Sequence, residues 1–162
     1  MITLLFTHTL QAKLTKPFAF ILTFSVGKHF VVLLVENKIE NIRKIQSVLE
    51  YVIKNNKPLL IIGEADEQVV SALAMNKLKG NIKVNIIDTP DFGIYRKQKL
   101  QDLALLTGAT VVNEDLGDDL DMIQVEMLGN CLKSITNSEE TILQVENTTE
   151  EVQDVINEIQ KS

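Results

Sequence analysis

The residues of this chain best suited to hold a cation are five acids that surround Gly117. They are Glu114, Asp115, Asp118, Asp119 and Asp121. Calcium prefers oxygen ligands, but a calcium loop needs them at fixed offsets with a closing glutamate, and that register is missing here. The pattern favours a solvated acidic loop over residues 114–121. Binding of a divalent metal or another ligand by this loop, in an α/β ligand-binding or enzymatic domain, stays as an alternative hypothesis.

Nucleophiles and soft metal ligands are few. His8, His29 and the single Cys131 lie far apart in the sequence, which argues against a structural zinc site. No base stands near Cys131, so this residue is predicted to be a small buried apolar side chain rather than a catalytic thiol. One cysteine cannot form an internal disulfide, and this fits a reducing intracellular setting.

Motifs that bind nucleotides or carry out catalysis are missing from the sequence. There is no glycine-rich phosphate loop, no GxGxxG after a strand and no GxSxG elbow. The tripeptide at residues 91–93 matches the kinase DFG motif, but the other kinase motifs do not accompany it. We therefore predict that the chain is not an enzyme, with no catalytic residue, no metal and no cofactor of its own.

The charge of the chain argues against nucleic acid as a partner. The sequence has 16 basic and 22 acidic residues, for a net charge of -6. The basic run at residues 96–99 could contact phosphates, but an acidic domain repels a polyanion, so a solvated helix turn is favoured. The apolar runs at residues 17–24 and 30–35 are shorter than the roughly 18 residues of a membrane-spanning helix. We expect no membrane partner either.

The hydrophobic pattern predicts one α/β domain. The length of 162 residues and the 45% hydrophobic content suit a single core. Short apolar runs alternate with segments whose apolar residues recur every three or four positions. Strands are predicted at 30–35, 58–63, 82–88 and 109–113, with a hairpin from 131–136 and 141–145. Helices are predicted at 41–54, at 66–79, around residues 100–106, and from residue 148 towards the end.

The first two predicted helices have apolar stripes that by default face a core. The first stripe consists of Ile42, Ile45, Leu49, Val52 and Ile53. The second consists of Val69, Val70, Leu73, Ala74 and Leu78. Both stripes are broad enough for some of their members to lie at an edge, and this applies above all to Leu49.

Several blocks of sequence, in a fixed order, resemble the apical domain of group I (GroEL-type) chaperonins. They are residues 41–43 (NIR) with 48–50 (VLE), 57–62 (KPLLII), 76–80 (NKLKG), 89–93 (TPDFG) with 96–97 (RK), and 105–112 (LLTGATVV). The resemblance divides the chain into a divergent segment, residues 1–26, and an apical domain, residues 27–162. It implies a central mixed sheet or β-sandwich flanked by helices, with two paired surface helices that form a groove.

The resemblance also implies a function. In that family the apical domain binds non-native polypeptides, and the mobile loop of a cochaperonin, in an apolar groove between two helices. The corresponding helices here are residues 41–54 and 66–79. The implied binding residues are Gln46, Leu49, Val70, Ala74, Met75 and Asn76. Gln46 stands where the family usually has leucine, and Phe18 is a further, weaker candidate from an aromatic contact segment.

The resemblance covers one module of a larger machine. The equatorial and intermediate domains of the family, which hold ATP, magnesium and the main ring contacts, have no counterpart in these 162 residues. We therefore expect a monomer that does not hydrolyse ATP, in the cytoplasm if bacterial or the mitochondrial matrix if eukaryotic. The other alternative is a module that engages a cochaperonin or inserts among intact chaperonins.

Overall fold

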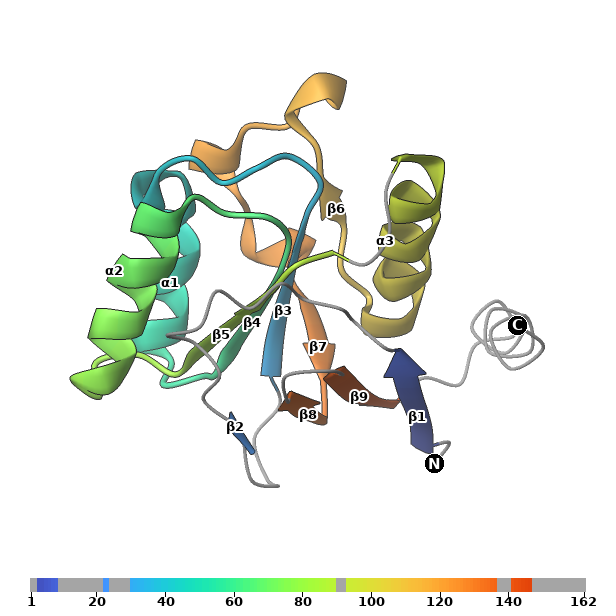
Figure 1. Cartoon of the computed structure of the whole chain (residues 1–162), viewed down its shortest axis with the longest axis horizontal. Helices are drawn as coiled ribbons and strands as arrows, with labels where there is room; N and C mark the ends of the chain where they lie inside the picture. The colour runs from blue at the N-terminus through green and yellow to red at the C-terminus, as the bar shows by residue number, and fades with distance from the viewer. Residues whose placement is uncertain (1–2, 9–21, 24–29, 90–92, 137–140, 147–162) are drawn as a thin grey trace.

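A five-stranded sheet covered by helices on both faces forms the centre of the protein (Figure 1). The computed structural model describes residues 3–8, 22–23, 30–89, 93–136 and 141–146. Among these residues, no helix has the length and apolar character needed to cross a bilayer. The elements of the sheet are β3 (Phe30–Val35), β4 (Leu59–Ile62), β5 (Val84–Ile87), β6 (Val111–Val112) and β7 (Gly129–Cys131).

The strand order of this sheet is β5-β4-β3-β6, and β7 also pairs with β3. Strands β3 to β6 run parallel, whereas β7 runs antiparallel to β3. β6 pairs with the last two residues of β3, and β7 pairs with its first three. The two short strands therefore share one side of β3.

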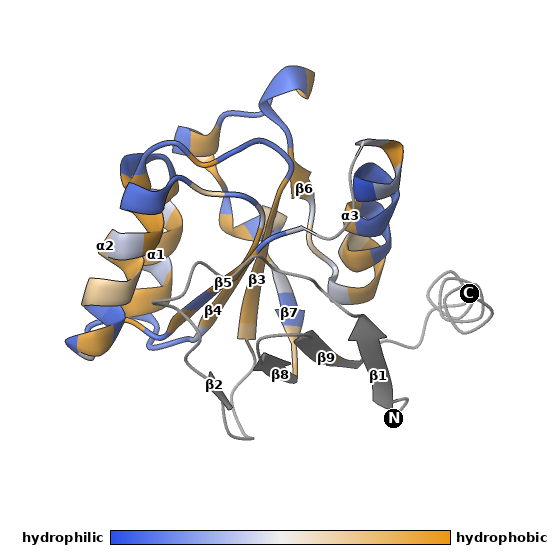
Figure 2. Ribbon diagram, viewed as in Figure 1, coloured by the Kyte–Doolittle hydropathy of each residue, from blue (hydrophilic) through white to orange (hydrophobic). Residues whose placement is uncertain are grey.

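Connection order decides which face each helix covers. α1 (Gln46–Lys54) and α2 (Glu67–Leu78) connect β3 to β4 and β4 to β5, so right-handed crossovers put both on one face. α3 (Gly93–Thr107) leads from β5 back to β6 on the far side of β3, and it lies on the other face (Figure 1). Figure 2 shows hydrophobic and hydrophilic residues mixed along the helices, and the buried ones include Val48 in α1, Val69 in α2 and Leu100 in α3.

Both faces of the central strands are buried, which explains their continuous apolar sequences. In β3 the residues alternate: Val31, Leu33 and Val35 belong to the core under α1 and α2. Phe30, Val32 and Leu34 belong to the core under α3. The predicted strands at 30–35, 58–63, 82–88 and 109–113 are confirmed, with bounds that differ by at most two residues at each end.

A second, antiparallel sheet has the order β1-β9-β8-β2. Its strands are β1 (Thr3–His8), β2 (Leu22–Thr23), β8 (Lys133–Thr136) and β9 (Thr141–Glu146). The predicted hairpin is confirmed as β8 and β9. The first strand of the hairpin begins at Lys133 and not at the predicted residue 131, because Cys131 pairs with Phe30 in the other sheet. The sequence pattern did not predict β1.

The connection between β3 and α1 also differs in detail from the predicted helix at 41–54. Residues Ile42–Ile45 form a 3-10 turn, η2, before α1 begins at Gln46. Asn41 caps η2 by accepting a hydrogen bond from the Arg43 backbone amide at 3.0 Å. The predicted terminal helix from residue 148 lies outside the described residues.

Candidate functional site

α1 and α2 carry the six residues that the resemblance predicts to bind a partner. Val48 and Val52 of α1 and Val69 and Leu73 of α2 are buried in one core against the sheet. That packing fixes both helices on the same face and turns their remaining sides towards solvent (Figure 1). We call the solvent-facing residues Leu49, Ile53, Val70, Ala74, Met75 and Leu78 the apolar surface of α1 and α2.

On α1 the two predicted residues differ in character. Leu49 is half-buried and packs against the core, so its side chain is shared between core and surface. Gln46 is exposed, and its Nε2 donates to Glu50 Oε1 at 2.7 Å. Gln46 therefore offers a polar contact at the position where the family usually has leucine, which would offer an apolar one. The first turn of α1 therefore contributes little apolar area.

On α2 the four predicted residues form a graded series. Val70 and Ala74 are half-buried, and Met75 is 56% exposed. Asn76 is exposed, and its Nδ2 donates to the carbonyl oxygen of Ala72 at 2.9 Å. Because this amide is bonded within its own helix, Asn76 has less freedom to donate to a bound chain. Phe18 lies outside the described residues.

Two further members of the predicted apolar stripes are exposed, and the resemblance did not include them among the binding residues. Ile53 is 53% exposed and Leu78 is 69% exposed. Each lies four residues after a predicted binding residue, Leu49 and Ala74 respectively, and i to i+4 neighbours share one face of a helix. That spacing was the signal that could have placed them. They extend the apolar surface towards the carboxyl ends of α1 and α2.

This surface can bind side chains by burial and carries no reactive group. Each Å² of apolar area removed from water contributes about 25 cal/mol. Met75 has a flexible, polarisable side chain that adapts to differently shaped partners.

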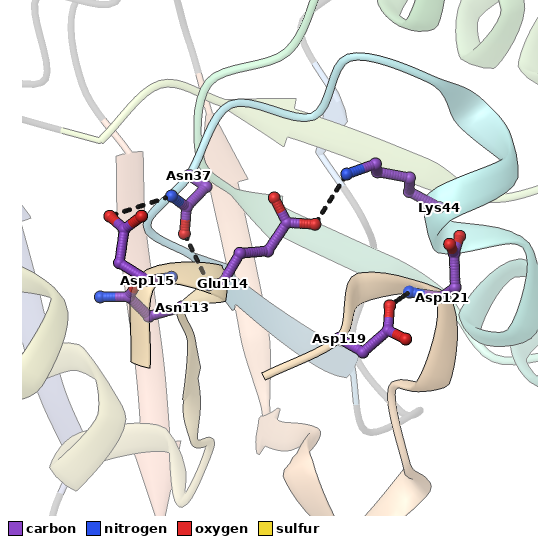
Figure 3. A network of polar contacts seen from close by, with 7 residues as sticks. All are labelled: Asn37, Lys44, Asn113, Glu114, Asp115, Asp119 and Asp121. Carbon is purple, nitrogen blue, oxygen red and sulfur yellow. Dashed lines mark hydrogen bonds and ion pairs between the residues drawn. The ribbon is translucent and has the colours of Figure 1, made fainter. Parts of the chain in front are cut away.

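A polar network lies elsewhere, at the edge of the sheet where the parallel strands end (Figure 3). Asn113, which follows β6, donates from Nδ2 to Glu36 Oε2 at 2.6 Å. Asn37 accepts from the backbone amide of Glu114 at 2.8 Å and donates to Asp115 at 3.4 Å. Lys44 forms an ion pair with Glu114 at 2.7 Å. We call this end of the sheet the carboxyl edge.

Four of the five acids of residues 114–121 have partners in the protein. Besides the contacts of Glu114 and Asp115, Asp118 accepts from the Asn113 backbone amide at 3.0 Å. Asp119 caps the turn η4 (Leu120–Met122) by accepting from the Asp121 amide at 2.9 Å. Within the described part of the chain, no group of three or more histidine, cysteine or acidic side chains is arranged to hold a metal ion.

The basic run at residues 96–99 also contributes to the carboxyl edge. Arg96 donates to the carbonyl oxygen of Glu36 at 2.9 Å and lies 3.7 Å from the Glu64 carboxylate. Lys97 pairs with the Glu36 carboxylate at 3.2 Å. The expectation of a solvated helix turn was therefore wrong for Arg96, which is half-buried and attaches α3 to the loops after β3 and β4.

Cys131 is buried, as the sequence analysis predicted. Burial disfavours the thiolate and raises the pKa of Cys131 to about 12. At neutral pH the side chain is a thiol in the core under α3. It serves packing and not nucleophilic chemistry.

The amino-acid sequence of the chain is similar to that of a chaperonin. The chain is 43% identical over 114 residues to the Arabidopsis thaliana protein named Chaperonin CPN60-like 1, mitochondrial. The match covers 70% of this chain and 20% of the relative, so the chain spans about a fifth of the length of that relative. This chain is a chaperonin homologue.

One solved structure agrees with the fold of this chaperonin homologue. The chaperonin gp146 from the bacteriophage EL 2 (Pseudomonas aeruginosa) matches with a TM-score of 0.57 and 18% identity. The match covers 85% of this chain and 27% of gp146. No protein-family model matches the chain. The α/β fold with a mixed sheet and flanking helices is therefore one that a chaperonin contains.

Proposed function

We propose that this chaperonin homologue is an apical-type module of the group I kind that captures non-native polypeptides on the apolar surface of α1 and α2. The observation that carries the proposal is the exposure of apolar side chains on two helices whose opposite sides are fixed in one core. An ordinary surface helix would present polar residues there. Exposed apolar groups in such a cluster are typical of interaction sites.

Capture by this surface needs neither ATP nor a defined client sequence. Apolar burial is non-directional, so any chain that exposes suitable side chains gains the same free energy per unit area. Binding is passive, and release follows when the client buries its own apolar residues. We propose residues 27–162 as the binding module, with residues 1–26 as a divergent segment, a monomeric state and no catalytic step.

Two further parts of the proposal, a second ligand and a cellular location, rest on the similarity to chaperonins. A cochaperonin loop is proposed as a second ligand of the same surface, because an apolar loop would bury the same side chains. The named relative is mitochondrial by its printed name. We extend that to the mitochondrial matrix for a eukaryotic source and to the cytoplasm for a bacterial one.

Suppression of aggregation of a denatured test protein measures the proposed activity. Leu49→Ser combined with Val70→Ser is expected to abolish suppression, because each change removes apolar area from one of the two helices. Since these two side chains are half-buried, Ile53→Ser combined with Leu78→Ser provides a second variant whose residues contribute little to the core. This pair is expected to reduce suppression with the fold retained.

The matched control removes exposed apolar residues of similar size elsewhere. Leu116 is 82% exposed and Ile94 is 74% exposed, and neither lies on α1 or α2. Leu116→Ser combined with Ile94→Ser is expected to leave suppression unchanged. Unchanged suppression in folded variants of both surface pairs would contradict the proposed function, as would equal loss in the control.

A further inference from the structure

The two ends of α1 and α2 differ sharply in charge. Residues 51–63 and 68–87 contain no aspartate or glutamate, although the whole chain has a net charge of -6. These two stretches contain five lysines: Lys54, Lys57, Lys77, Lys79 and Lys83. We call these five residues the lysine edge.

The fold brings these lysines together at the end of the sheet where β4 and β5 begin. Lys54 and Lys77 lie in the last turns of α1 and α2. Lys57 and Lys83 each come just before a strand, and the Leu59 amide donates to the Lys83 carbonyl oxygen at 2.8 Å. Figure 1 shows the carboxyl ends of both helices at this end of the molecule.

The lysine edge lacks the carboxylate partners that cations have at the carboxyl edge. There, Lys38 pairs with Asp66, Lys44 with Glu114, Arg96 with Glu64 and Lys97 with Glu36. In the described parts of the chain, none of the five edge lysines forms an ion pair with a carboxylate. Lys57 instead lies 5.6 Å from the centre of the Tyr51 ring.

Exposed apolar side chains adjoin these charges. Ile53 precedes Lys54, and Leu78 lies between Lys77 and Lys79 in the sequence, while Met75 lies one turn earlier. Figure 2 shows hydrophobic and hydrophilic segments next to each other at this end of α1 and α2. A partner that covered Ile53 and Leu78 would place its own flanking residues among the lysines.

We propose that the apolar surface of α1 and α2 prefers polypeptide segments whose apolar residues are flanked by acidic ones, and that the lysine edge supplies this preference. The proposal rests on the proposed function and names the class of client. Complementary charge at the rim of an interface accelerates association and discriminates between partners more than it adds affinity. Within the described residues no carboxylate pairs with these five lysines, so an acidic client gains attraction there without breaking an ion pair.

Stabilisation of the helix ends is a simpler explanation for these lysines. Cations near a helix carboxyl terminus stabilise the helix through its dipole, by about 0.3–1 kcal/mol each. Lys54 and Lys77 are in position for that role. Lys83 lies outside both helices and immediately before a strand, so the dipole does not account for it. The experiment therefore compares ligand preference and stability in the same variants.

Three labelled peptides test the preference on the full chain. They share one pattern of leucines at helical spacing and carry glutamate, glutamine or lysine at the flanking positions. At a salt concentration of about 0.05 M, where charges interact over more than about 10 Å, fluorescence anisotropy is expected to show about tenfold tighter binding of the glutamate peptide than of the glutamine peptide. The lysine peptide is expected to bind most weakly, and salt of about 0.5 M is expected to bring the three affinities together.

The variant Lys54→Gln, Lys79→Gln and Lys83→Gln removes the three exposed edge lysines. It is expected to lose the preference for the glutamate peptide and to keep its affinity for the glutamine peptide. The control adds the same net negative charge at exposed positions elsewhere, through Gln98→Glu, Gln101→Glu and Gln124→Glu. This control is expected to keep most of the preference, because the charges around α1 and α2 are unchanged.

The possible outcomes separate this proposal from the proposed function. Equal binding of the glutamate and glutamine peptides would overturn the charge preference and leave polypeptide capture standing. A triple lysine variant that loses thermal stability but keeps the preference would assign the lysines to the helix ends and overturn the proposal too. Failure of all three peptides to bind would overturn both. A single-stranded oligonucleotide that bound as tightly as the glutamate peptide would show a surface that selects charge alone, and that would also overturn the proposal.

Discussion

Asn113 donates a hydrogen bond of 2.6 Å to the carboxylate of Glu36, and this bond joins the chain segments that leave β6 and β3. The two residues are 77 positions apart in the sequence. Asn113 is 2% exposed, and its Oδ1 also accepts from the Asp115 amide at 2.8 Å. One side chain therefore holds the turn η3 (Glu114–Leu116) against the loop after β3.

Replacement of Asn113 is expected to destabilise the fold. Asn113→Ala leaves the Glu36 carboxylate without one donor and the Asp115 amide without its acceptor, and a buried group that loses its partner costs about 1–3 kcal/mol. Urea unfolding followed by circular dichroism should show a lower free energy of unfolding by about that amount. Asn130→Ala, at an exposed position of β7, serves as the control and should change stability by less than about 0.5 kcal/mol. Equal effects of the two variants would show that the bond to Glu36 contributes nothing net.

Lys77 makes stability depend on alkaline pH. Burial lowers the pKa of Lys77 from 10.5 to about 8 in the folded protein. Below pH 8 the lysine is charged in both the folded and unfolded states, and the folded state bears the cost of desolvating that charge. Between pH 8 and 10.5 Lys77 is deprotonated in the folded state and still protonated in the unfolded state. The unfolded state then binds more protons, so the contribution of Lys77 to the free energy of unfolding rises with pH.

The variant Lys77→Met isolates this effect, because it retains the aliphatic part of the side chain and removes the charge. It is expected to be more stable than the parent chain at pH 7, and the gap should narrow as pH rises from 8 towards 10.5. Thermal unfolding at a series of pH values measures the gap. Asn76→Ala, at the neighbouring position, provides the control whose difference from the parent should not change with pH. A Lys77→Met gap that stayed constant over this range would contradict the assigned desolvation.

Much of the central sheet could be predicted from local pattern, because each of its long strands is an apolar run bounded by a change of period. β3 has the predicted bounds of Phe30 and Val35. β1 was missed because its pairing with β9 joins residues 3–8 to residues 141–146, and no local signal reports a partner so far away. The division at Cys131 was missed for the same reason, since Phe30 determines the sheet to which this residue belongs.

The two helices that carry the candidate site could be predicted from the sequence, but the exposure of their individual residues could not. The resemblance placed six residues on α1 and α2, and the structure puts all six on those helices with exposed or half-buried side chains. Periodicity alone could not tell Ile53 from Val52, because both fall within a broad apolar stripe. The structure separates them by orientation, with Val52 at 1% and Ile53 at 53% exposed. The half-buried position of Arg96 was not predicted, because its partner Glu64 follows a different strand and is distant in the sequence.

Gly63 is expected to be intolerant of any side chain. A Cβ atom at this position would lie 2.8 Å from the carbonyl oxygen of Val35 and 3.2 Å from its Cβ, where β3 and β4 end side by side. Both atoms belong to Val35, the last residue of the central strand β3, so relief requires backbone movement. Gly63→Ala is expected to lower the free energy of unfolding by about 1–3 kcal/mol, the usual cost of overpacking.

Urea unfolding tests this expectation against Ser71→Ala, an exposed position within α2 where alanine has the better helix propensity. That control should be neutral or slightly stabilising. If Gly63→Ala left the free energy of unfolding unchanged, the ends of β3 and β4 would have to separate easily.

Cys131 provides a probe of the core that joins the two sheets. Because its pKa is raised to about 12 and its side chain is buried beside Phe30 and Leu143, the thiol is expected to resist a thiol-specific reagent at pH 8 in the folded protein. In denaturant the same thiol should react at the rate of an unstructured cysteine, whose pKa of about 8.5 leaves a substantial thiolate fraction. The ratio of the two rates reports how often this core opens. Fast labelling under native conditions, in protein whose circular dichroism is unchanged, would show that β7 detaches from β3 while the helices stay folded, and the assignment of Cys131 to a stable core would fail.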